Sequence, residues 1–285
     1  MESVSFVRLL LDNPTSQVTI VSSMQDPASQ NILKSLIAKH GFESSTVKGV
    51  FVHPDHNVRI VTLEKQGIYV EPTDIESRGS SILFASKHVS ASNRPAMTVH
   101  ATGNLGKTSE FGGRPEEVSL VNPSMIRRAL RTMNDRVVEA GLDIDVTMEA
   151  THHGPTSFDV PICFVEIGSG SREWTDPVLG EIAADAIFDA ATAKHEAGKA
   201  AVGFGGTHYS AKFTRSCLEG DYAIGHFVPR HAIEAGITDA VIKDTFAKTV
   251  PSCDIALVDW KGLNGEDRRT LVTKLEKWGY ATVRC

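Results

Sequence analysis

The sequence predicts an α/β protein in which a largely parallel sheet carries helices on both faces. Two observations support this prediction. Short apolar runs with strand character alternate with amphipathic helical segments along nearly the whole chain of 285 residues, and several of the helical segments begin at recognisable caps. Because no internal repeat, low-complexity tract or linker interrupts the pattern, we expect residues 1–285 to form a single α/β domain with elaborations.

The first elements of the chain illustrate the alternation. Residues 17–23, QVTIVSS, have the composition of a strand. Asp26 is placed to cap the following helix with Pro27 at its first position, and Gly41 is placed to end it. The apolar face of this helix consists of Ile32, Leu33, Leu36 and Ile37.

The later elements follow the same scheme. Strands are predicted at residues 58–64, 80–86, 96–102, 144–151, 161–168, 200–206, 222–228 and 254–260. Helices are predicted from Pro123 to about Ala140, from Pro177 to near Gly198, after a cap at Thr238 and over residues 266–278, before a short strand at 280–284.

Composition narrows the class of protein. With 41% hydrophobic and 22% charged residues the chain can bury a large core, and no apolar run approaches the ~20 residues that span a bilayer. The N-terminus is a poor signal peptide. The four cysteines are far apart and form no CxxC, which disfavours a disulfide framework and indicates a reducing cytoplasm. A net charge of −6 argues against bulk nucleic-acid binding but leaves room for a local basic face.

Many of the predicted strands end in polar residues that a core would not select. The carboxyl ends of parallel strands share one edge of a sheet, where ligands bind, so up to five of the 11 histidines would gather there. His152 and His153 can converge on one ligand only if the chain leaves extended geometry, which Gly154-Pro155 permits. The polar strand ends are Lys87-His88, His100, Thr102-Gly103-Asn104, Thr151-His152-His153-Gly154, Glu166, Gly205 to Tyr209, His226, Asp259 and Lys261.

The gathered side chains leave several chemistries open. A single histidine after a strand is most often a cap or a satisfied surface residue. A zinc ion held by dispersed residues is the alternative, although HExxH and any compact His/Cys spacing are absent. The candidate zinc ligands are His152, His153, His208 and Glu166.

Two further local patterns have competing interpretations. The backbone at Gly205-Gly206 could bind a phosphate or an oxyanion, or it could form only a tight turn. No GxSxG motif is present, which disfavours an α/β serine hydrolase, and the short segment with Ser86, His88 and Ser90 does not make a triad.

Two helices carry clusters of basic residues. In the helix that begins at Pro123, three arginines lie opposite the apolar face and form either a solvated surface or a phosphate-contacting patch. These arginines are Arg127, Arg128 and Arg131, and the apolar face is Ile126, Leu130, Met133 and Val137. A second basic group in the last helix consists of Arg268, Arg269, Lys274 and Lys277.

Several unusual motifs occur in order between residues 80 and 280. They are SKHVS with RPAMTVHATGN (86–104), FGGRPEEVSLVNPSMI (111–126), EATHHGPT (149–156), CFVEIGS (163–169), EWTDP (173–177), GFGGTHYSAKFT (203–214), GHFVP (225–229) and DWKGL (259–263). In these motifs the sequence resembles the D-aminoacyl-tRNA deacylases of the archaeal and plant type. The first 80 residues resemble that family less distinctively.

The resemblance implies hydrolysis of the ester between a D-amino acid and the 3′ end of tRNA, which frees the tRNA and keeps D-residues out of translation. It also implies a fold related to peptidyl-tRNA hydrolases and nucleoside phosphorylases, a zinc cofactor, and a role towards aldehyde-modified D-aminoacyl-tRNAs. We therefore expect a cytoplasmic enzyme whose partner is tRNA charged with a D-amino acid, without a membrane or an obligate protein partner.

Residue roles follow from the chemistry of an activated ester, which needs a positioned water, a base and an oxyanion stabiliser. We assign base and metal duties jointly to His88, His100, His152, His153 and His208. Glu166 would orient a histidine or bind metal, and the backbone of Gly205-Gly206-Thr207 would bind the oxyanion or the terminal ribose. The expected substrate contacts are Asn104, Glu166, Gly205, Gly206, Thr207, Tyr209, Arg127, Arg128 and Arg131.

Two rival functions make different predictions. A hydrolase or phosphorylase acting on a small nucleoside would work without tRNA and would not need the basic helices. A non-catalytic RNA-binding module would need the basic helices and would tolerate loss of the histidines. The clustered imidazoles disfavour the second rival.

Overall fold

The computed structural model describes residues 17–75, 81–193 and 198–285. The N-terminal segment that reads as a poor signal peptide lies outside these ranges, apart from Gln17. In the described part of the chain, no helix combines the length and apolar character needed to cross a membrane.

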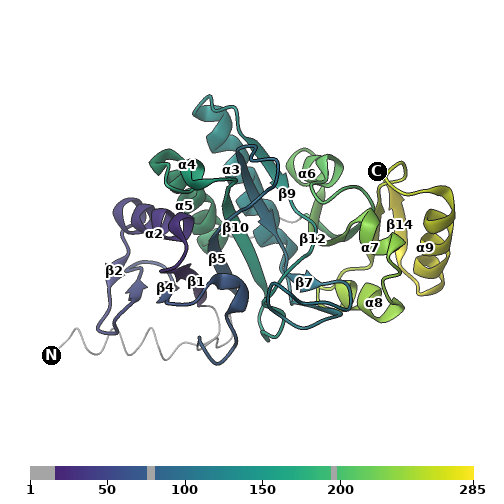
Figure 1. Cartoon of the computed structure of the whole chain (residues 1–285), viewed down its shortest axis with the longest axis horizontal. Helices are drawn as coiled ribbons and strands as arrows, with labels where there is room; N and C mark the ends of the chain where they lie inside the picture. Colours follow the sequence, from purple (N-terminus) through teal and green to yellow (C-terminus); the bar gives the residue numbers. More distant parts are fainter. Residues whose placement is uncertain (1–16, 76–80, 194–197) are drawn as a thin grey trace.

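Most strands belong to two separate sheets (Figure 1). The larger sheet has eight strands, namely β1 (Val18–Ser23), β2 (Glu43–Ser44), β3 (Val50–Val52), β4 (Val58–Leu63), β5 (Ile82–Lys87), β6 (Ala96–His100), β9 (Asp145–Met148) and β10 (Ile162–Gly168). The smaller sheet has four strands, namely β11 (Lys199–Phe204), β12 (Tyr222–Val228), β13 (Ile255–Val258) and β14 (Ala281–Arg284). A two-stranded ribbon is formed by β7 (Gly103–Asn104) and β8 (Glu117–Val118).

Most neighbouring strands in both sheets run parallel. The eight-stranded sheet has the order β2-β3-β4-β1-β5-β10-β6-β9, and its central strands β4, β1, β5 and β10 are parallel. Strand β6 runs antiparallel to β10, and β9 runs parallel to β6. The small sheet has the order β12-β11-β13-β14 and is parallel throughout. The α/β class and the largely parallel pairing predicted from the sequence are confirmed, although the strands divide between two sheets.

The helices begin and end where local chemistry requires. They are α2 (Pro27–His40), α3 (Pro123–Glu139), α4 (Ser171–Trp174), α5 (Pro177–Thr192), α6 (Ala211–Leu218), α7 (Arg230–Glu234), α8 (Asp239–Ala247) and α9 (Gly265–Lys277), with a short 3₁₀ helix η1 (Gly67–Tyr69). The Asp26 carboxylate accepts hydrogen bonds from the amides of Ala28 and Ser29, and Gly41 ends α2 in the left-handed conformation. Helix α5 ends before the predicted Gly198, because Ala193 is extended.

The two faces of the large sheet are covered differently. Helices α2, α3 and α5 pack against one face, where alternate strand residues such as Leu83 and Val165 join the main hydrophobic core. The intervening residues, such as Phe84 and Phe164, point to the opposite face and pack against Val70, Ile75 and Phe158 from irregular segments. In the small sheet, by contrast, α6 packs with one set of strand residues and α8 and α9 with the other, so that sheet carries helices on both faces. The face of the large sheet that holds Phe164 is therefore the one on which a site can form.

Candidate active site

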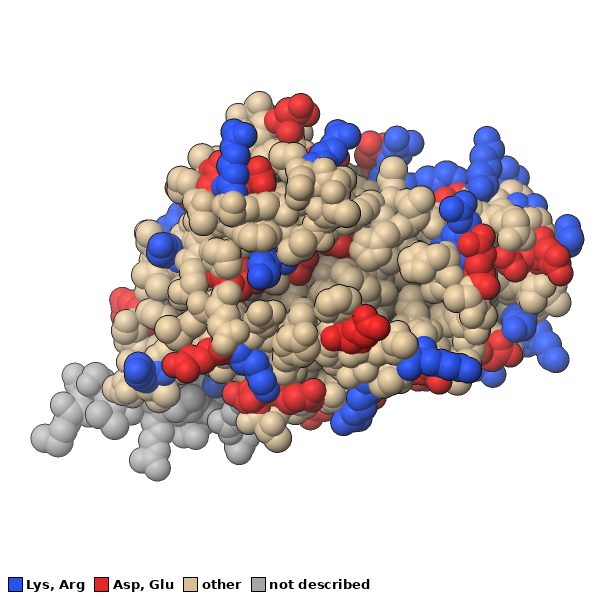
Figure 2. Space-filling model, viewed as in Figure 1, with Lys and Arg blue, Asp and Glu red and all other residues tan. Residues whose placement is uncertain are grey.

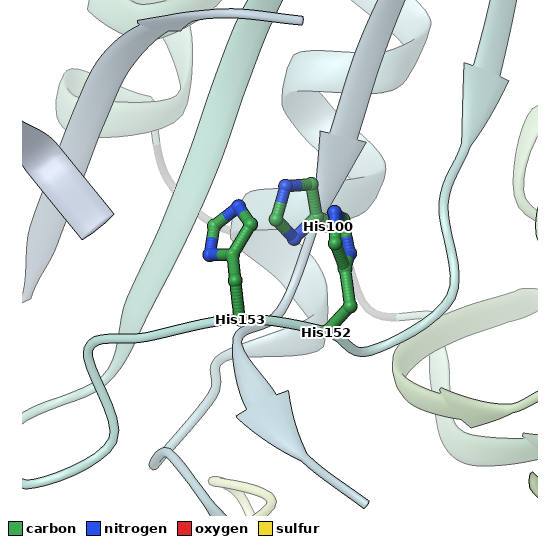
Figure 3. Close-up of side chains that lie close together, drawn as sticks. All are labelled: His100, His152 and His153. Atoms are coloured by element: carbon green, nitrogen blue, oxygen red, sulfur yellow. The ribbon is translucent and has the colours of Figure 1, made fainter. Parts of the chain in front are cut away.

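Five histidines from distant parts of the chain converge on one place. The ring centroid of His152 lies 4.3 Å from that of His100, 4.4 Å from that of His153 and 4.7 Å from that of His208. Figure 3 shows the rings of His100, His152 and His153 grouped together. His88 joins them through Glu149, whose carboxylate oxygens lie 3.1 Å from His88 Nδ1 and 3.0 Å from His208 Nε2. The histidines that the sequence assigned to base and metal duties thus form one cluster.

The cluster lies on the face of the large sheet and not at a common edge of strand ends. His100 ends β6, but β6 is antiparallel to β10, so His100 pairs with Phe164 in the middle of β10. The His100 ring stacks on the Phe164 ring with centroids 5.5 Å apart. The expectation that all these strands end at one edge is therefore corrected for β6. His100 and Glu166 meet because both lie on the sheet face that holds Phe164, and His208 joins them from the segment after β11 of the small sheet.

The backbone of the ATHHGPT segment (150–156) explains how two adjacent histidines point into one site. His153 has a φ of 42°, in the left-handed region, so the chain leaves extended geometry between the two residues as predicted. The segment is held at both ends, since Thr151 N donates to Phe227 O at 3.0 Å and Gly154 N donates to Phe111 O at 3.0 Å. Gly103 N also donates to His153 O at 2.8 Å. These bonds fix the pair between the two sheets.

Three of the imidazoles are oriented by backbone carbonyls. A carbonyl can only accept, so the Nδ1 atom beside it must carry a proton, and Nε2 is the nitrogen directed at the cluster. This is the arrangement in which a protein presents histidine to a metal or to a proton that must be removed. The three bonds run from His100 Nδ1 to Ala101 O (3.1 Å), from His152 Nδ1 to Ala150 O (2.7 Å) and from His153 Nδ1 to Gly154 O (2.6 Å).

Two buried carboxylates lie among the histidines. Glu149 is 2% exposed and Glu166 is 3% exposed. Glu166 lies 3.6 Å from His88 Nδ1 and 3.8 Å from His100 Nε2, while Glu149 Oε2 lies 3.8 Å from His152 Nε2. Glu166, which the sequence predicts to orient a histidine or bind metal, lies within this group. Glu149 was not predicted, although it carries the same signal as Glu166, an acid within an apolar strand-like run.

The histidines of the cluster fall into two groups, those whose pKa is raised and those whose pKa is lowered. Burial lowers the pKa of His88, but its interactions with Glu149 and Glu166 outweigh burial and raise that pKa to about 10. Burial, together with the neighbouring His100, lowers the pKa of His153 to about 4 and the pKa of His152 well below its ordinary value. The same pairings hold the pKa of both carboxylates below their usual range despite burial. At neutral pH the cluster therefore contains both charged imidazoles and neutral ones able to accept a proton.

The donor set suits a metal ion. Three overlapping groups bring their ligand atoms within 4.8 Å of one another. One buried polar atom of these groups, His100 Nε2, has no hydrogen-bond partner, since Glu166 Oε1 lies 3.8 Å from it. Orphaned atoms of this kind are costly unless something binds them, and imidazole nitrogen with carboxylate oxygen is a usual zinc environment. The groups are His100 with His152 and His153, Glu149 with His152 and His208, and His88 with Glu149 and Glu166.

A cavity of about 1110 Å³ opens above the cluster. His152 and His208 are each about one third exposed at its floor, whereas His100 is fully buried beneath them. The Tyr209 hydroxyl lies 3.0 Å from His88 Nε2, and its ring also lines the cavity. Figure 2 shows that the molecule is hollowed near the middle of this face, where mostly uncharged residues surround the hollow. The cavity is large enough for a substrate with several polar groups.

Several other predicted substrate contacts either do not line the cavity or are bonded to another part of the chain. Gly205, Gly206 and Thr207 do not line the cavity. Gly205 and Gly206 have φ values of 98° and 76°, and the Gly205 amide donates to Val228 O, so this backbone forms a tight turn and not the expected oxyanion site. Asn104 does line the cavity, but its Nδ2 donates to Gly112 O and Arg114 O and holds a loop in place.

His226 also differs from the strand-end histidines. It is fully buried, its Nε2 donates to Ser119 O at 3.0 Å and its Nδ1 lies 3.2 Å from Thr151 Oγ1. His226 thus supports the residue that precedes His152 instead of lining the cavity.

The arginines of α3 do not form the expected phosphate-contacting face. Arg127 is 7% exposed and donates to the carbonyls of Cys217 and Gly220. Arg131 donates to the carbonyls of Cys217 and Leu218, and Arg128 pairs with Asp189 at 2.6 Å. The helical pattern located these side chains on one side of α3 but could not show that α5 and α6 pack against that side.

In the last helix two of the four basic residues are also engaged. The Arg268 guanidinium lies over the Trp260 ring, and Lys274 pairs with Asp239 at 2.7 Å. Arg269 and Lys277 are exposed.

Comparison with known proteins shows which family the chain is similar to. A family model described as D-aminoacyl-tRNA deacylase matches residues 75–283. A protein of Methanosarcina acetivorans named D-aminoacyl-tRNA deacylase is 36% identical over 280 residues, covering 94% of this chain and 92% of that protein. A protein of the same name from Pyrococcus furiosus is 36% identical over 258 residues, covering 88% and 93%. A crystal structure described as a conserved protein of unknown function superposes with a TM-score of 0.85 at 28% identity, covering 94% of this chain and 95% of that one.

Proposed function

The chain belongs to the D-aminoacyl-tRNA deacylase family and hydrolyses the ester of D-aminoacyl-tRNA, and we propose that the cavity above the histidine cluster is where it does so. The observation that supports this location is the convergence of five histidines and two buried carboxylates at the floor of one cavity. The names of the relatives do not favour the rival that acts on small nucleosides.

His152 is our candidate for the general base. Its low pKa keeps the imidazole neutral near pH 7, and the Ala150 carbonyl fixes the proton on Nδ1. Its Nε2 therefore carries the lone pair, and the side chain is exposed enough to reach a water in the cavity. A neutral, oriented imidazole within reach of water is what ester hydrolysis needs from a base. Glu149 holds the neighbouring His208 at 3.0 Å, so His208 can pass a proton onward.

Tyr209 is our candidate for the oxyanion stabiliser, in place of the Gly205-Gly206 turn. His88 is protonated at neutral pH and donates from Nε2 to the Tyr209 oxygen. The tyrosine hydroxyl can then donate its own proton to charge that develops on the ester oxygen, and burial raises its pKa so that it stays neutral. A donor already polarised by a buried cation loses little free energy to reorganisation when the transition state forms.

We propose zinc as the cofactor because the histidine and glutamate donors and the unpartnered His100 Nε2 fit it. His100, His152 and His153 would form the ligand group. An ion held there would occupy the Nε2 lone pair of His152, so the base of the zinc-loaded enzyme would be His208 instead. When bound, zinc would supply a Lewis acid beside the reacting ester. Because ligands must be deprotonated, a bound cation would replace the proton that His100 shares with Glu166, while His88 lies outside this ligand group and would keep its proton.

The finer properties implied by the family are also proposals. A tRNA substrate would place the enzyme in the cytoplasm, which agrees with four free cysteine thiols. The cavity volume leaves space for an amino acid whose amino group carries an aldehyde adduct.

The test is deacylation of D-Tyr-tRNA and L-Tyr-tRNA by the purified protein, with and without a chelator and then with zinc restored. We expect selective hydrolysis of the D-ester and loss of rate on chelation. His152→Ala and His208→Ala should each lower kcat/KM by about 100-fold or more, while His56→Ala, an exposed histidine away from the cavity, should not change it. Near-normal turnover in both cavity variants would overturn the site, and failure to hydrolyse either ester with zinc supplied would favour the nucleoside-directed rival.

A further inference from the structure

The exposed phenylalanine and tyrosine side chains in the described part of the chain are gathered in one place. Among the residues that the structure describes, the exposed phenylalanine, tyrosine and tryptophan side chains are Tyr69 (44%), Phe111 (61%) and Tyr209 (38%). All three line the cavity above the histidine cluster. Tyr209 contacts His88 there, whereas Tyr69 and Phe111 have no assigned role. Aromatic surface left in water at the mouth of a cavity is typical of a binding site.

Tyr69 and Phe111 belong to two segments that are packed directly on each other. Gly112 and Gly113 follow Phe111 in the left-handed conformation, with φ values of 78° and 71°. A Cβ on Gly112 would overlap the Ile68 carbonyl oxygen and would reach within 3.3 Å of the Tyr69 ring. The glycine thus allows the loop that carries Phe111 to lie against the segment that carries Tyr69.

The same loop is tied to the catalytic cluster. The Phe111 carbonyl accepts a hydrogen bond from the amide of Gly154, which directly follows His153. Asn104 holds Gly112, the residue after Phe111, because its Nδ2 donates to Gly112 O at 2.9 Å. The position of the two aromatic rings is therefore set relative to the histidines by backbone bonds and close packing.

We propose that Tyr69 and Phe111 are a stacking platform for the terminal bases of the single-stranded 3′ end of tRNA. This inference rests on the proposed function and adds to it how the ester reaches His152. The 3′ end has the same bases in every tRNA, and stacking on aromatic rings binds bases without needing to read their sequence. Positive charge does not explain binding at this mouth, because its lining carries two lysines, Lys87 and Lys107. Three carboxylates outside the histidine cluster also line it, those of Asp26, Glu110 and Glu116.

The experiment is a binding cycle with uncharged tRNA, so that hydrolysis does not interfere. Full-length tRNA and the same tRNA without its terminal CCA are titrated against wild-type protein, Phe111→Ala, Tyr69→Ala and Phe111→Trp. Removing CCA should weaken binding to the wild type by about 10- to 100-fold, the scale of one or two stacked bases. Phe111→Ala should weaken binding of the full-length tRNA by about 10-fold and leave binding of the shortened tRNA unchanged. Phe111→Trp should restore the preference for CCA.

Each other outcome overturns the inference. If Phe111→Ala and Tyr69→Ala weaken both tRNAs equally, or neither, the platform does not bind the 3′ end. If Phe111→Ala leaves binding of both uncharged tRNAs unchanged and, in a parallel deacylation assay, changes only the preference among D-amino acids, the platform binds the amino-acid side chain. Val138→Ala, which truncates an apolar side chain of α3 that is 70% exposed and lies away from the cavity, is the matched control. Failure of the proposed function is a separate result, since wild-type protein would then not deacylate D-Tyr-tRNA whatever the cycle shows.

Discussion

Replacing Glu149 by glutamine removes one buried charge and keeps the shape of the side chain. Glu149 lies between His88 and His208, at 3.1 and 3.0 Å, and is 2% exposed. The substitution leaves His88 with Glu166 as its remaining carboxylate, at 3.6 Å. We expect Glu149→Gln to lower stability and activity together, because the same carboxylate holds a buried cation and orients the histidines on the cavity floor.

The magnitude follows from the pKa of His88. The difference between its ordinary value of 6.5 and about 10 corresponds to about 5 kcal/mol, and two carboxylates produce it. Loss of one of them should cost roughly half, about 2–3 kcal/mol, at the lower end of the range for breaking a buried charge pair. Because the folded pKa is above the unfolded one, the pairing contributes its full stability at pH 6.5 and loses it as pH rises towards 10. The difference in stability between wild type and variant should therefore shrink over that range.

The measurement is denaturant unfolding of both proteins after chelator treatment, at pH 6.5 and at pH 10, with deacylation kinetics in parallel. Glu276→Gln, which changes an exposed glutamate of α9, is the matched control. A stability difference that is the same at both pH values would refute the charge-pair argument. Wild-type kcat/KM in Glu149→Gln would refute the role of this carboxylate in the site.

Three further predictions concern residues around the site. Arg127→Ala should destabilise the protein by about 2–4 kcal/mol in denaturant unfolding, because the variant loses a buried guanidinium that donates to two backbone carbonyls. It should leave the salt dependence of tRNA binding unchanged, whereas a flatter salt dependence at normal stability would restore the phosphate-contacting role. Gly112→Ala should destabilise the loop that carries Phe111 by about 2 kcal/mol or more, because the added Cβ would overlap the Ile68 carbonyl oxygen. The measurement is amide-exchange protection at Gly154, which should fall; protection equal to that of the wild type would contradict the close packing. Burial lowers the pKa of His226 to about 4, so the folded state resists protonation of this residue and the stability of the protein should fall by about 3 kcal/mol as pH drops from 6.5 to 4. The stability of His226→Gln should fall less over that range, and an identical fall would exclude His226 as the source.

Much of the fold could be predicted because local chemistry determines it. Helix α2 has its Asp26 cap, its Pro27 start and its Gly41 end where the sequence places them, since these features depend on neighbouring residues alone. Every strand expected between residues 58 and 260 exists, because a run of apolar residues needs burial wherever it lies. The division into two sheets was not predicted, because strand pairing depends on contacts between residues far apart in the sequence.

The residues of the candidate site were predicted from the sequence for a similar reason. Polar residues at the ends of buried strands are unfavourable without a function, and this identified His88, His100, His152 and Glu166. The reason given for their meeting was incomplete, because the antiparallel β6 brings His100 to the sheet face instead of a common edge.

The sequence by itself determined the α/β class, the family and the histidines that gather, because periodicity, caps and motifs are properties of short segments. Only the tertiary structure decided that Glu149 lies at the centre of the cluster, that the arginines of α3 are used in packing, and that Tyr69 and Phe111 meet at the mouth of the cavity. Each of these depends on which segments face each other across the two sheets. A side chain's partner is set by folding in three dimensions, while its own preference for burial or exposure is already present in the chain.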